Sequence, residues 1–197
     1  MKQLLTDIIT ESEIQEMLYE YHGSDVYESS SMNKLKPGPA TDFIDDFVTG
    51  YKRVGGNYYM HSTPYLPHTD HKKEWNESIN VIVPLYVENN ASLVVFDQRY
   101  YHDSVTWCLH NDLIEFKYNT GVLGRPYDYD IKGKTEKNIS DDLYELLDWA
   151  PKEQWFGLTG DAFEFIPGNV LIFDNKHIHA TSKFEGSKIG LSLRYAK

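Results

Sequence analysis

The sequence predicts a mainly β fold with helices at the N-terminus, followed by two packed antiparallel sheets. Helical spacing of apolar residues occurs near the start of the chain, whereas from Tyr51 onward short β-like runs alternate with turn residues. Helices followed by many short strands are typical of double-sheet folds. The 197 residues, 41% of them hydrophobic, suffice for one sizeable core. We therefore expect a single domain over residues 1–197.

The N-terminal part, about residues 1–50, holds the helical signals. The stretch Thr10-Glu11-Ser12-Glu13 has the spacing of a capping box and precedes apolar residues at helical spacing, which predicts a helix from about Glu11 to Tyr21. A polar stretch follows, from Gly23 to Pro39. Thr41 is followed by aspartates, which are favoured near the positive end of a helix, so we expect a second short helix that ends near Gly50.

The rest of the chain, about residues 51–197, is predicted to form the sheets. A Gly- and Tyr-rich stretch and a short amphipathic helix opening at Ser140 interrupt them, so we interpret about residues 119–160 as an insertion. The alternation of strands and turns predicts a jelly-roll barrel, the double-stranded β-helix shared by cupins, whose mouth can hold a metal. The candidate strands are 80–87, 92–96, 105–109, 113–118, 162–166, 170–173 and 189–195.

Composition excludes several classes of function. The net charge of −11 repels polyphosphates, so we expect no nucleic-acid partner. No window approaches the roughly 20 apolar residues that a bilayer helix needs. Asp7, Glu11 and Glu13 stand where a signal peptide would be apolar, so we expect a cytoplasmic protein without a membrane partner. Cys108 is the only cysteine, which excludes an intramolecular disulfide and a thiolate metal cluster.

A candidate metal motif, Pro67-His68-Thr69-Asp70, stands just before the strongest strand run. Residues i and i+2 of an extended chain face the same side, so His68 and Asp70 can point together. One imidazole and one carboxylate are two of the three ligands of the facial triad that holds non-haem Fe(II). A second such triplet, His110-Asn111-Asp112, leaves less sheet before the next histidine, and we interpret it as a solvated turn.

The third ligand is expected from PGNVLIFDNKHIHAT, residues 167–181. Its Pro-Gly pair predicts a turn, its apolar run predicts a strand, and Asp174-Asn175 predicts a bend before His177 and His179. The spacing of two places both histidines on one face if the chain is extended there. A triad needs only one of them.

Together, PHTD, INVIVPLYV, PGNVLIFDNKHIHAT and SKIGLSLRY resemble the Fe(II)/2-oxoglutarate-dependent oxygenase superfamily, particularly its phytanoyl-CoA-hydroxylase-like and prolyl-hydroxylase-like branches. The resemblance covers about Tyr58 to Tyr195. It implies Fe(II), 2-oxoglutarate and O2, and hydroxylation of a small molecule, amino acid or peptide side chain. By position, it implies that His68, Asp70 and His179 ligate the iron.

The resemblance also indicates how 2-oxoglutarate would bind. The family pairs an arginine on its last strand with the distal carboxylate of this cosubstrate, and Lys188 occupies that position here. This departs from the pattern, because lysine cannot make the two-pronged contact that arginine makes. Arg194 and Ser192 share the same strand face. Arg194 is the alternative partner for the carboxylate, and Ser192 is a candidate hydrogen-bond donor.

Residues around the metal motif carry two further expectations. Tyr58, Tyr59 and Tyr65 precede it and could offer a hydroxyl to 2-oxoglutarate or shape the pocket, and we select Tyr58 as the cosubstrate contact. Halogenating relatives have a small residue in place of the carboxylate ligand. Because Asp70 retains the carboxylate, the resemblance favours hydroxylation or a related oxidation.

Two other functions remain open from the sequence. A cupin-like metalloenzyme would bind metal without 2-oxoglutarate, and a non-catalytic β-barrel binding protein would need neither. Metal content separates the non-catalytic binding protein from the two metalloenzymes. Dependence on 2-oxoglutarate then separates the oxygenase from the cupin-like metalloenzyme. The net negative charge favours a neutral or cationic substrate. The residues name no individual substrate and no oligomeric state.

Overall fold

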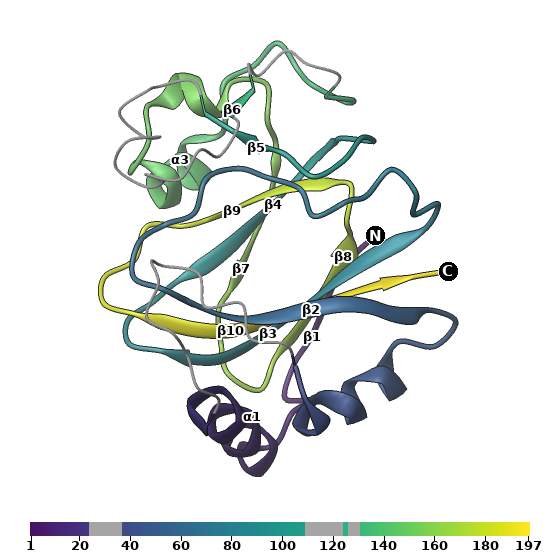
Figure 1. Ribbon diagram of the computed structural model, residues 1–197. Coiled ribbons are helices and arrows are strands. Elements are labelled where there is room, and N and C mark those ends of the chain that lie inside the picture. Colours follow the sequence, from purple (N-terminus) through teal and green to yellow (C-terminus); the bar gives the residue numbers. More distant parts are fainter. Residues whose placement is uncertain (24–36, 109–123, 126–130) are drawn as a thin grey trace.

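Two antiparallel sheets form the body of the protein (Figure 1). The structure is a computed structural model that describes residues 1–23, 37–108, 124–125 and 131–197. The larger sheet has the order β1 (Lys2–Leu5), β8 (Val170–Asp174), β3 (Ser78–Val87), β10 (Lys188–Ala196) and β2 (Lys52–His61). The smaller sheet has the order β7 (Gly160–Glu164), β4 (Ser92–Arg99) and β9 (His177–Thr181), and a short parallel pair joins β5 (Thr106–Trp107) to β6 (Gly124–Arg125).

These pairings confirm the mainly β class and the antiparallel sheets. The predicted barrel is not confirmed, because over the described residues the larger and smaller sheets remain separate and no sheet closes. The helices are a minor part of the fold. In the described ranges they are α1 (Glu11–Gly23), the 3-10 helix η1 (Pro39–Phe47), α3 (Asp141–Leu147) and the 3-10 helix η2 (Lys152–Trp155). No helix in this part of the chain is long and apolar enough to cross a bilayer.

The strand predictions succeed where the apolar runs are long. Strands β3, β4, β7, β8 and β10 all overlap their predicted ranges, whereas the weak candidate 105–109 shrinks to β5. The prediction missed β1, which pairs antiparallel with β8 from Lys2↔Phe173 to Leu5↔Val170. The candidate strand 113–118 and the His110-Asn111-Asp112 triplet lie outside the described residues, as does most of the polar stretch after α1.

Two of the three predicted helix starts, those of α1 and α3, carry side-chain caps, whereas η1 begins after Gly38 without one. The backbone N–H and the hydroxyl of Thr10 each donate to Glu13 Oε2 at 2.7 Å, which closes the capping box before α1. Ser140 Oγ accepts from Leu143 N at 3.5 Å at the start of α3. The second N-terminal helix forms as η1 rather than as an α-helix.

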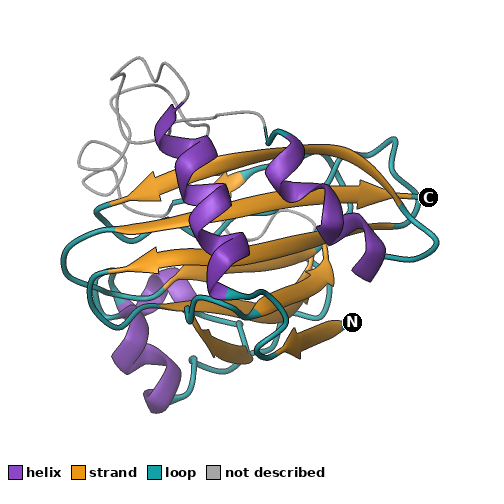
Figure 2. Cartoon of the chain, turned by 90° about the horizontal axis from the view of Figure 1, so that it is seen from below, coloured by secondary structure: helices purple, strands orange, loops and turns teal. Residues whose placement is uncertain are grey.

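Apolar residues separate the fold into layers. Figure 2 shows α1 and η1 lying across the outer face of the larger sheet, where Val81 and Val83 of β3 join the first core cluster. Ile82, between them in sequence, points to the opposite face and packs in the cluster between the two sheets. The outer face of the smaller sheet packs through Phe96 against Trp155 and the α3 region. The polar residues described next line a cavity between the sheets.

Glu20 ties α1 to the larger sheet. Its Oε1 accepts from Gly38 N at 2.7 Å and from the Tyr58 hydroxyl at 2.6 Å, and its Oε2 accepts from Ala40 N at 3.2 Å. We expect Glu20→Ala to lower the free energy of unfolding by about 2–3 kcal/mol, because it leaves a buried hydroxyl without its acceptor. Urea unfolding of this variant beside Glu16→Ala, an exposed glutamate on the same helix, measures the effect. Equal losses in the two variants would contradict the assignment.

Candidate metal centre

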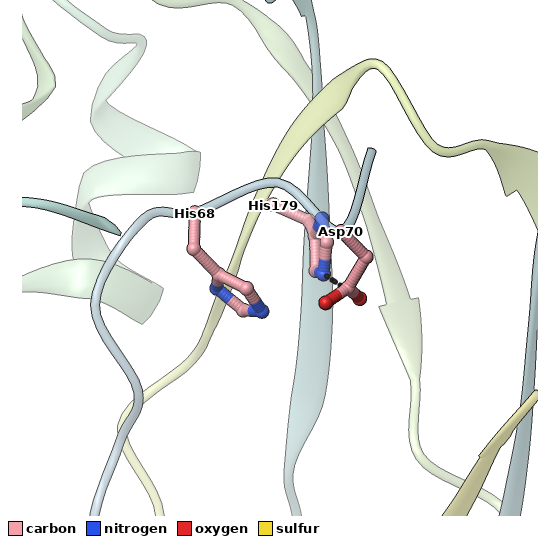
Figure 3. Close-up of side chains that lie close together, drawn as sticks. All are labelled: His68, Asp70 and His179. Atoms are coloured by element: carbon pink, nitrogen blue, oxygen red, sulfur yellow. Dashed lines mark ion pairs between the residues drawn. The ribbon is translucent and has the colours of Figure 1, made fainter. Parts of the chain in front are cut away.

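Three side chains that lie far apart in the sequence converge between the sheets. His68, in the segment that joins β2 to β3, forms an isolated bridge with His179 of β9, with backbone N–H···O distances of 3.0 and 2.9 Å. Asp70 follows two residues after His68. In Figure 3 the three side chains point toward one another, and their ligand atoms all lie within 4.8 Å of each other. The structure thus brings together the three residues that the sequence singles out.

Backbone carbonyls fix the orientation of both imidazoles. His68 Nδ1 lies 2.9 Å from the Leu66 carbonyl oxygen, and His179 Nδ1 lies 3.2 Å from that of His177. A carbonyl oxygen can only accept, so each Nδ1 carries the proton and each Nε2 keeps a free lone pair. Burial, with His179 beside it, lowers the pKa of His68 to about 3, so this imidazole is neutral at physiological pH. Two such nitrogens and one carboxylate form a donor set that fits a divalent transition metal.

Asp70 is held as the ionised third donor. Its Oδ2 accepts from Asn80 Nδ2 at 2.9 Å and lies 3.6 Å from His179 Nε2, while its Oδ1 lies 3.6 Å from Arg194 Nη2. Burial alone would raise the pKa of this carboxyl. The close polar contact with His179 and the charge of Arg194 outweigh burial and hold the pKa well below its usual range. The carboxylate is therefore ready to bind a cation.

A cavity of about 200 Å3 opens beside the three ligands. Lys188, Ser192 and Arg194 of β10 line it, as the sequence predicts for alternate residues on one strand face. Ile82 and Leu93 add apolar wall from the two sheets. The cavity thus combines a candidate metal centre with cationic and apolar surfaces.

Lys188 lies inside the protein with an unusual environment for a charged group. It is 1% exposed, and its Nζ lies over the rings of Phe165 and Phe184, 4.5 and 5.2 Å from their centroids. Among the described residues, no carboxylate forms an ion pair with this amine. Burial lowers the pKa of Lys188 to about 7. The amine therefore lines the cavity without a counter-ion from the described residues, and an anionic ligand there would favour its protonated form.

Ser192 is the second unsatisfied polar group on this strand. Its hydroxyl is buried and lacks a hydrogen-bond partner within the described structure. Buried polar groups in proteins are rarely left unpaired, because each costs about 1–3 kcal/mol. A hydroxyl that faces a cavity without a partner is placed to bind a ligand.

Tyr58 requires a correction. It does not line the cavity but packs in the core beneath α1, where its hydroxyl donates to Glu20. Side chains alternate along β2, so Asn57 and Tyr59 face the cavity instead. Burial raises the pKa of Tyr59, which keeps its phenol a neutral donor. A Cβ at Gly190 would lie 2.5 Å from the Tyr59 hydroxyl, so glycine leaves the room that this ring occupies.

His177 does not join the ligands. It is buried, its Nδ1 lies 2.6 Å from the carbonyl oxygen of Phe96, and its Nε2 lies 3.4 Å from Arg99 Nη2. The even spacing of His177 and His179 on β9 does not distinguish the two histidines. The bridge of His179 to His68 brings His179 into the candidate cluster.

Comparison with solved structures finds several that share the fold of this chain. No family model matches the chain, and no curated protein is detectably similar to it in sequence. The non-haem α-ketoglutarate-dependent epimerase SnoN from nogalamycin biosynthesis superposes with a TM-score of 0.55 at 12% identity, over 100% of this chain and 78% of SnoN. HygX from Streptomyces hygroscopicus, solved with nickel, 2-oxoglutarate and hygromycin B, gives 0.55 at 11% identity, over 99% and 82%.

A prolyl-4-hydroxylase from Pseudomonas putida gives a TM-score of 0.53 at 7% identity, over 100% of this chain and 92% of the hydroxylase. At these identities the comparisons establish a shared architecture. The chain therefore has the fold of several Fe/2-oxoglutarate-dependent enzymes, as its motifs predict.

Proposed function

We propose that the protein is an Fe(II)- and 2-oxoglutarate-dependent oxygenase that oxidises a small molecule, with hydroxylation as its basic reaction. One observation carries the proposal: the His68, Asp70 and His179 cluster opens onto a cavity that is also lined by a buried lysine, for which the described residues provide no counter-ion. The shared fold supports it. SnoN has been solved with Fe3+, α-ketoglutarate and nogalamycin RO, and HygX with hygromycin B, which supports a small-molecule substrate here.

The residues present fit an iron centre. His68 and His179 would each bind the metal through Nε2, and Asp70 would bind through its carboxylate. When bound, Fe(II) and 2-oxoglutarate together supply the activation of O2 that oxidises the substrate. The protein supplies the ligand geometry, a negative charge at Asp70 and a cavity between the sheets.

Lys188 is the better partner for the distal carboxylate of 2-oxoglutarate. Lys188 and Arg194 lie six residues apart on β10, which separates their Cα atoms by about 20 Å. Arg194 Nη2 lies 3.6 Å from Asp70, at the metal end of the cavity. The carboxylate that points away from the metal would therefore meet Lys188. Ser192, between the two cations, would donate a hydrogen bond to the cosubstrate.

Anaerobic spectroscopy tests the proposal. Fe(II) and then 2-oxoglutarate are added to metal-free protein, and we expect the weak visible charge-transfer band of a keto acid chelated to Fe(II). The His179→Ala variant should give no band, because it lacks one metal ligand. If metal binds without a band, the cupin-like metalloenzyme becomes the better reading. If no metal binds, the protein is a non-catalytic binding protein.

The two neighbouring tyrosines give a matched pair of variants. We expect Tyr59→Phe to weaken 2-oxoglutarate binding about fivefold, because it removes one hydrogen bond to the cosubstrate. Tyr58→Phe should leave that affinity unchanged and lower the free energy of unfolding by about 1–2 kcal/mol, because Glu20 loses its phenol partner. Titration of the charge-transfer band and urea unfolding measure the two effects. The reverse assignment of effects would restore Tyr58 as the cosubstrate contact.

A further inference from the structure

Arg194 leaves most of its hydrogen-bonding capacity unused. Its Nη2 donates to Asn57 Oδ1 at 3.0 Å and lies 3.6 Å from Asp70 Oδ1, too far for a hydrogen bond. Within the described part of the chain, its Nε and Nη1 have no acceptor. The guanidinium carries five N–H donors in a planar fork, and the side chain is 26% exposed where it lines the cavity.

Arg53, on the same sheet, shows what a structural arginine does in this protein. Its Nε donates to Asp45 at 2.8 Å, and its Nη1 and Nη2 donate to the hydroxyl and carbonyl oxygens of Thr41 at 2.8 and 2.7 Å. All three nitrogens have partners from the protein. Among the described residues, Arg194 makes one hydrogen bond, to Asn57, and one longer ion pair, with Asp70, both through Nη2, and offers the rest of its fork to the cavity. Such a fork matches the two oxygens of a carboxylate.

There is room for a ligand beside Arg194. In the register between β10 and β2, Arg194 is paired with Gly55, so the two residues share one face of the sheet. Among the described residues, a Cβ at Gly55 would meet no atom within 4 Å. The absent side chain therefore leaves open space next to the guanidinium. This space lies next to Arg194, near the opposite end of β10 from Lys188.

Charge balance favours an anion at this place. In the loaded site of the proposed function, the charges of Fe(II) and of the 2-oxoglutarate dianion cancel. Asp70, whose carboxylate lies 3.6 Å from Arg194, offsets only one of the two cations Lys188 and Arg194. Because electrostatic interactions are stronger in a poorly hydrated cavity than in water, the net positive charge that remains favours a negatively charged ligand group.

We infer that Arg194, held in place by Asn57, binds the carboxylate of the substrate, so that the substrate is a small organic acid or amino acid oxidised at a carbon near that carboxylate. The inference rests on the proposed function and deepens it. It reverses the expectation drawn from the net charge of −11, because the local charge of the cavity, not that of the whole surface, acts on a bound substrate.

Acetate is the probe that tests this assignment without knowledge of the substrate. The full-length protein is loaded with Mn(II), which replaces Fe(II) without redox chemistry, and with saturating 2-oxoglutarate. We expect a saturable increase in the relaxation rate of the acetate methyl protons, and no saturable increase with acetamide, which has the same shape without the charge. Arg194→Met should weaken acetate binding at least tenfold. Arg99→Met removes an arginine that does not line the cavity and should leave acetate binding unchanged.

Two further measurements separate this role from others. The free Mn(II) signal in electron paramagnetic resonance shows whether each variant still holds metal. If Arg194→Met does not hold metal, Arg194→Lys replaces it in the binding measurements. This variant keeps the positive charge beside Asp70 but loses the planar fork of the guanidinium. It should bind acetate about five- to tenfold more weakly than wild type. Titration of the Fe(II) charge-transfer band measures the affinity for 2-oxoglutarate. This affinity should change less than threefold in whichever Arg194 variant retains the metal.

The outcomes distinguish this inference from the proposed function. If the affinity for 2-oxoglutarate falls as much as that for acetate in the Arg194 variant that retains the metal, Arg194 binds the cosubstrate and the inference is wrong. The same conclusion follows if added 2-oxoglutarate displaces acetate. A wild-type protein that gives the band but no saturable acetate signal overturns the inference alone. A wild-type protein that gives no band overturns the proposed function and the inference with it.

Discussion

Replacing Lys188 with methionine is expected to abolish measurable 2-oxoglutarate binding and, at the same time, to make the metal-free protein more stable. The amine is 1% exposed, lies against two aromatic rings and has no carboxylate partner among the described residues. Methionine has a similar length and packs well against aromatic rings. The substitution therefore removes a buried charge without opening a large cavity.

The sign of the stability change follows from the pKa of Lys188. Burial lowers this pKa from 10.5 to about 7 in the folded protein. Below pH 7 both folded and unfolded states hold the proton, and the folded state carries the full cost of the buried charge. Above pH 10.5 neither state is charged, and the cost is gone. Unfolding free energy of the wild type should thus rise between these pH values, and Lys188→Met should add on the order of 3–5 kcal/mol at pH 6.

The effect on cosubstrate binding has the opposite sign. A charge-assisted hydrogen bond from a buried amine to a carboxylate is lost, which should weaken 2-oxoglutarate binding about 100-fold or more. Urea unfolding at pH 6 and pH 10, together with titration of the charge-transfer band, measures both effects. Lys52→Met, an exposed lysine on β2, is the matched control and should change neither quantity. A destabilised Lys188→Met that still binds 2-oxoglutarate would make Lys188 a structural residue.

Local patterns, together with the resemblance to a known family, located the candidate ligands. The spacing of His68 and Asp70 and the Pro-Gly turn, strand and bend before His179 are all features of short segments. What joins the segments is the bridge between His68 and His179, which depends on the fold of the intervening strands. The resemblance to a known family supplied that connection in advance. Without it, each motif alone would have been ambiguous.

Which side chains of a strand point into the cavity could not be predicted in the same way. Tyr58 and Tyr59 are adjacent, so which of them faces the cavity depends on the register of β2 against β10, which contains a bulge after Arg194. Strand β1 has little β-like pattern of its own and forms because β8 offers it an edge. Lys188 and Arg194 share one strand face, and only their surroundings distinguish them.

Asp70→Ala is expected to remove metal binding. Wild-type protein should gain about 2.7 kcal/mol of stability when Mn(II) is present at 100 times its dissociation constant, because the metal binds the folded state. The variant should gain almost nothing at the same concentration, since it loses the charged donor of the three. Asp46→Ala, which removes an exposed carboxylate from η1, should show the same gain as wild type.

The quantity to compare is the metal-induced gain and not the stability of the metal-free proteins. Without metal, Asp70→Ala already loses the acceptor of Asn80 Nδ2 and the carboxylate closest to Arg194. This loss should lower its unfolding free energy by about 1–3 kcal/mol. Differential scanning fluorimetry with and without Mn(II) separates the loss of stability in the metal-free protein from the loss of the metal-induced gain. If Asp70→Ala retained the full gain, the metal would bind elsewhere, and the cluster with His68 and His179 would not be the metal centre.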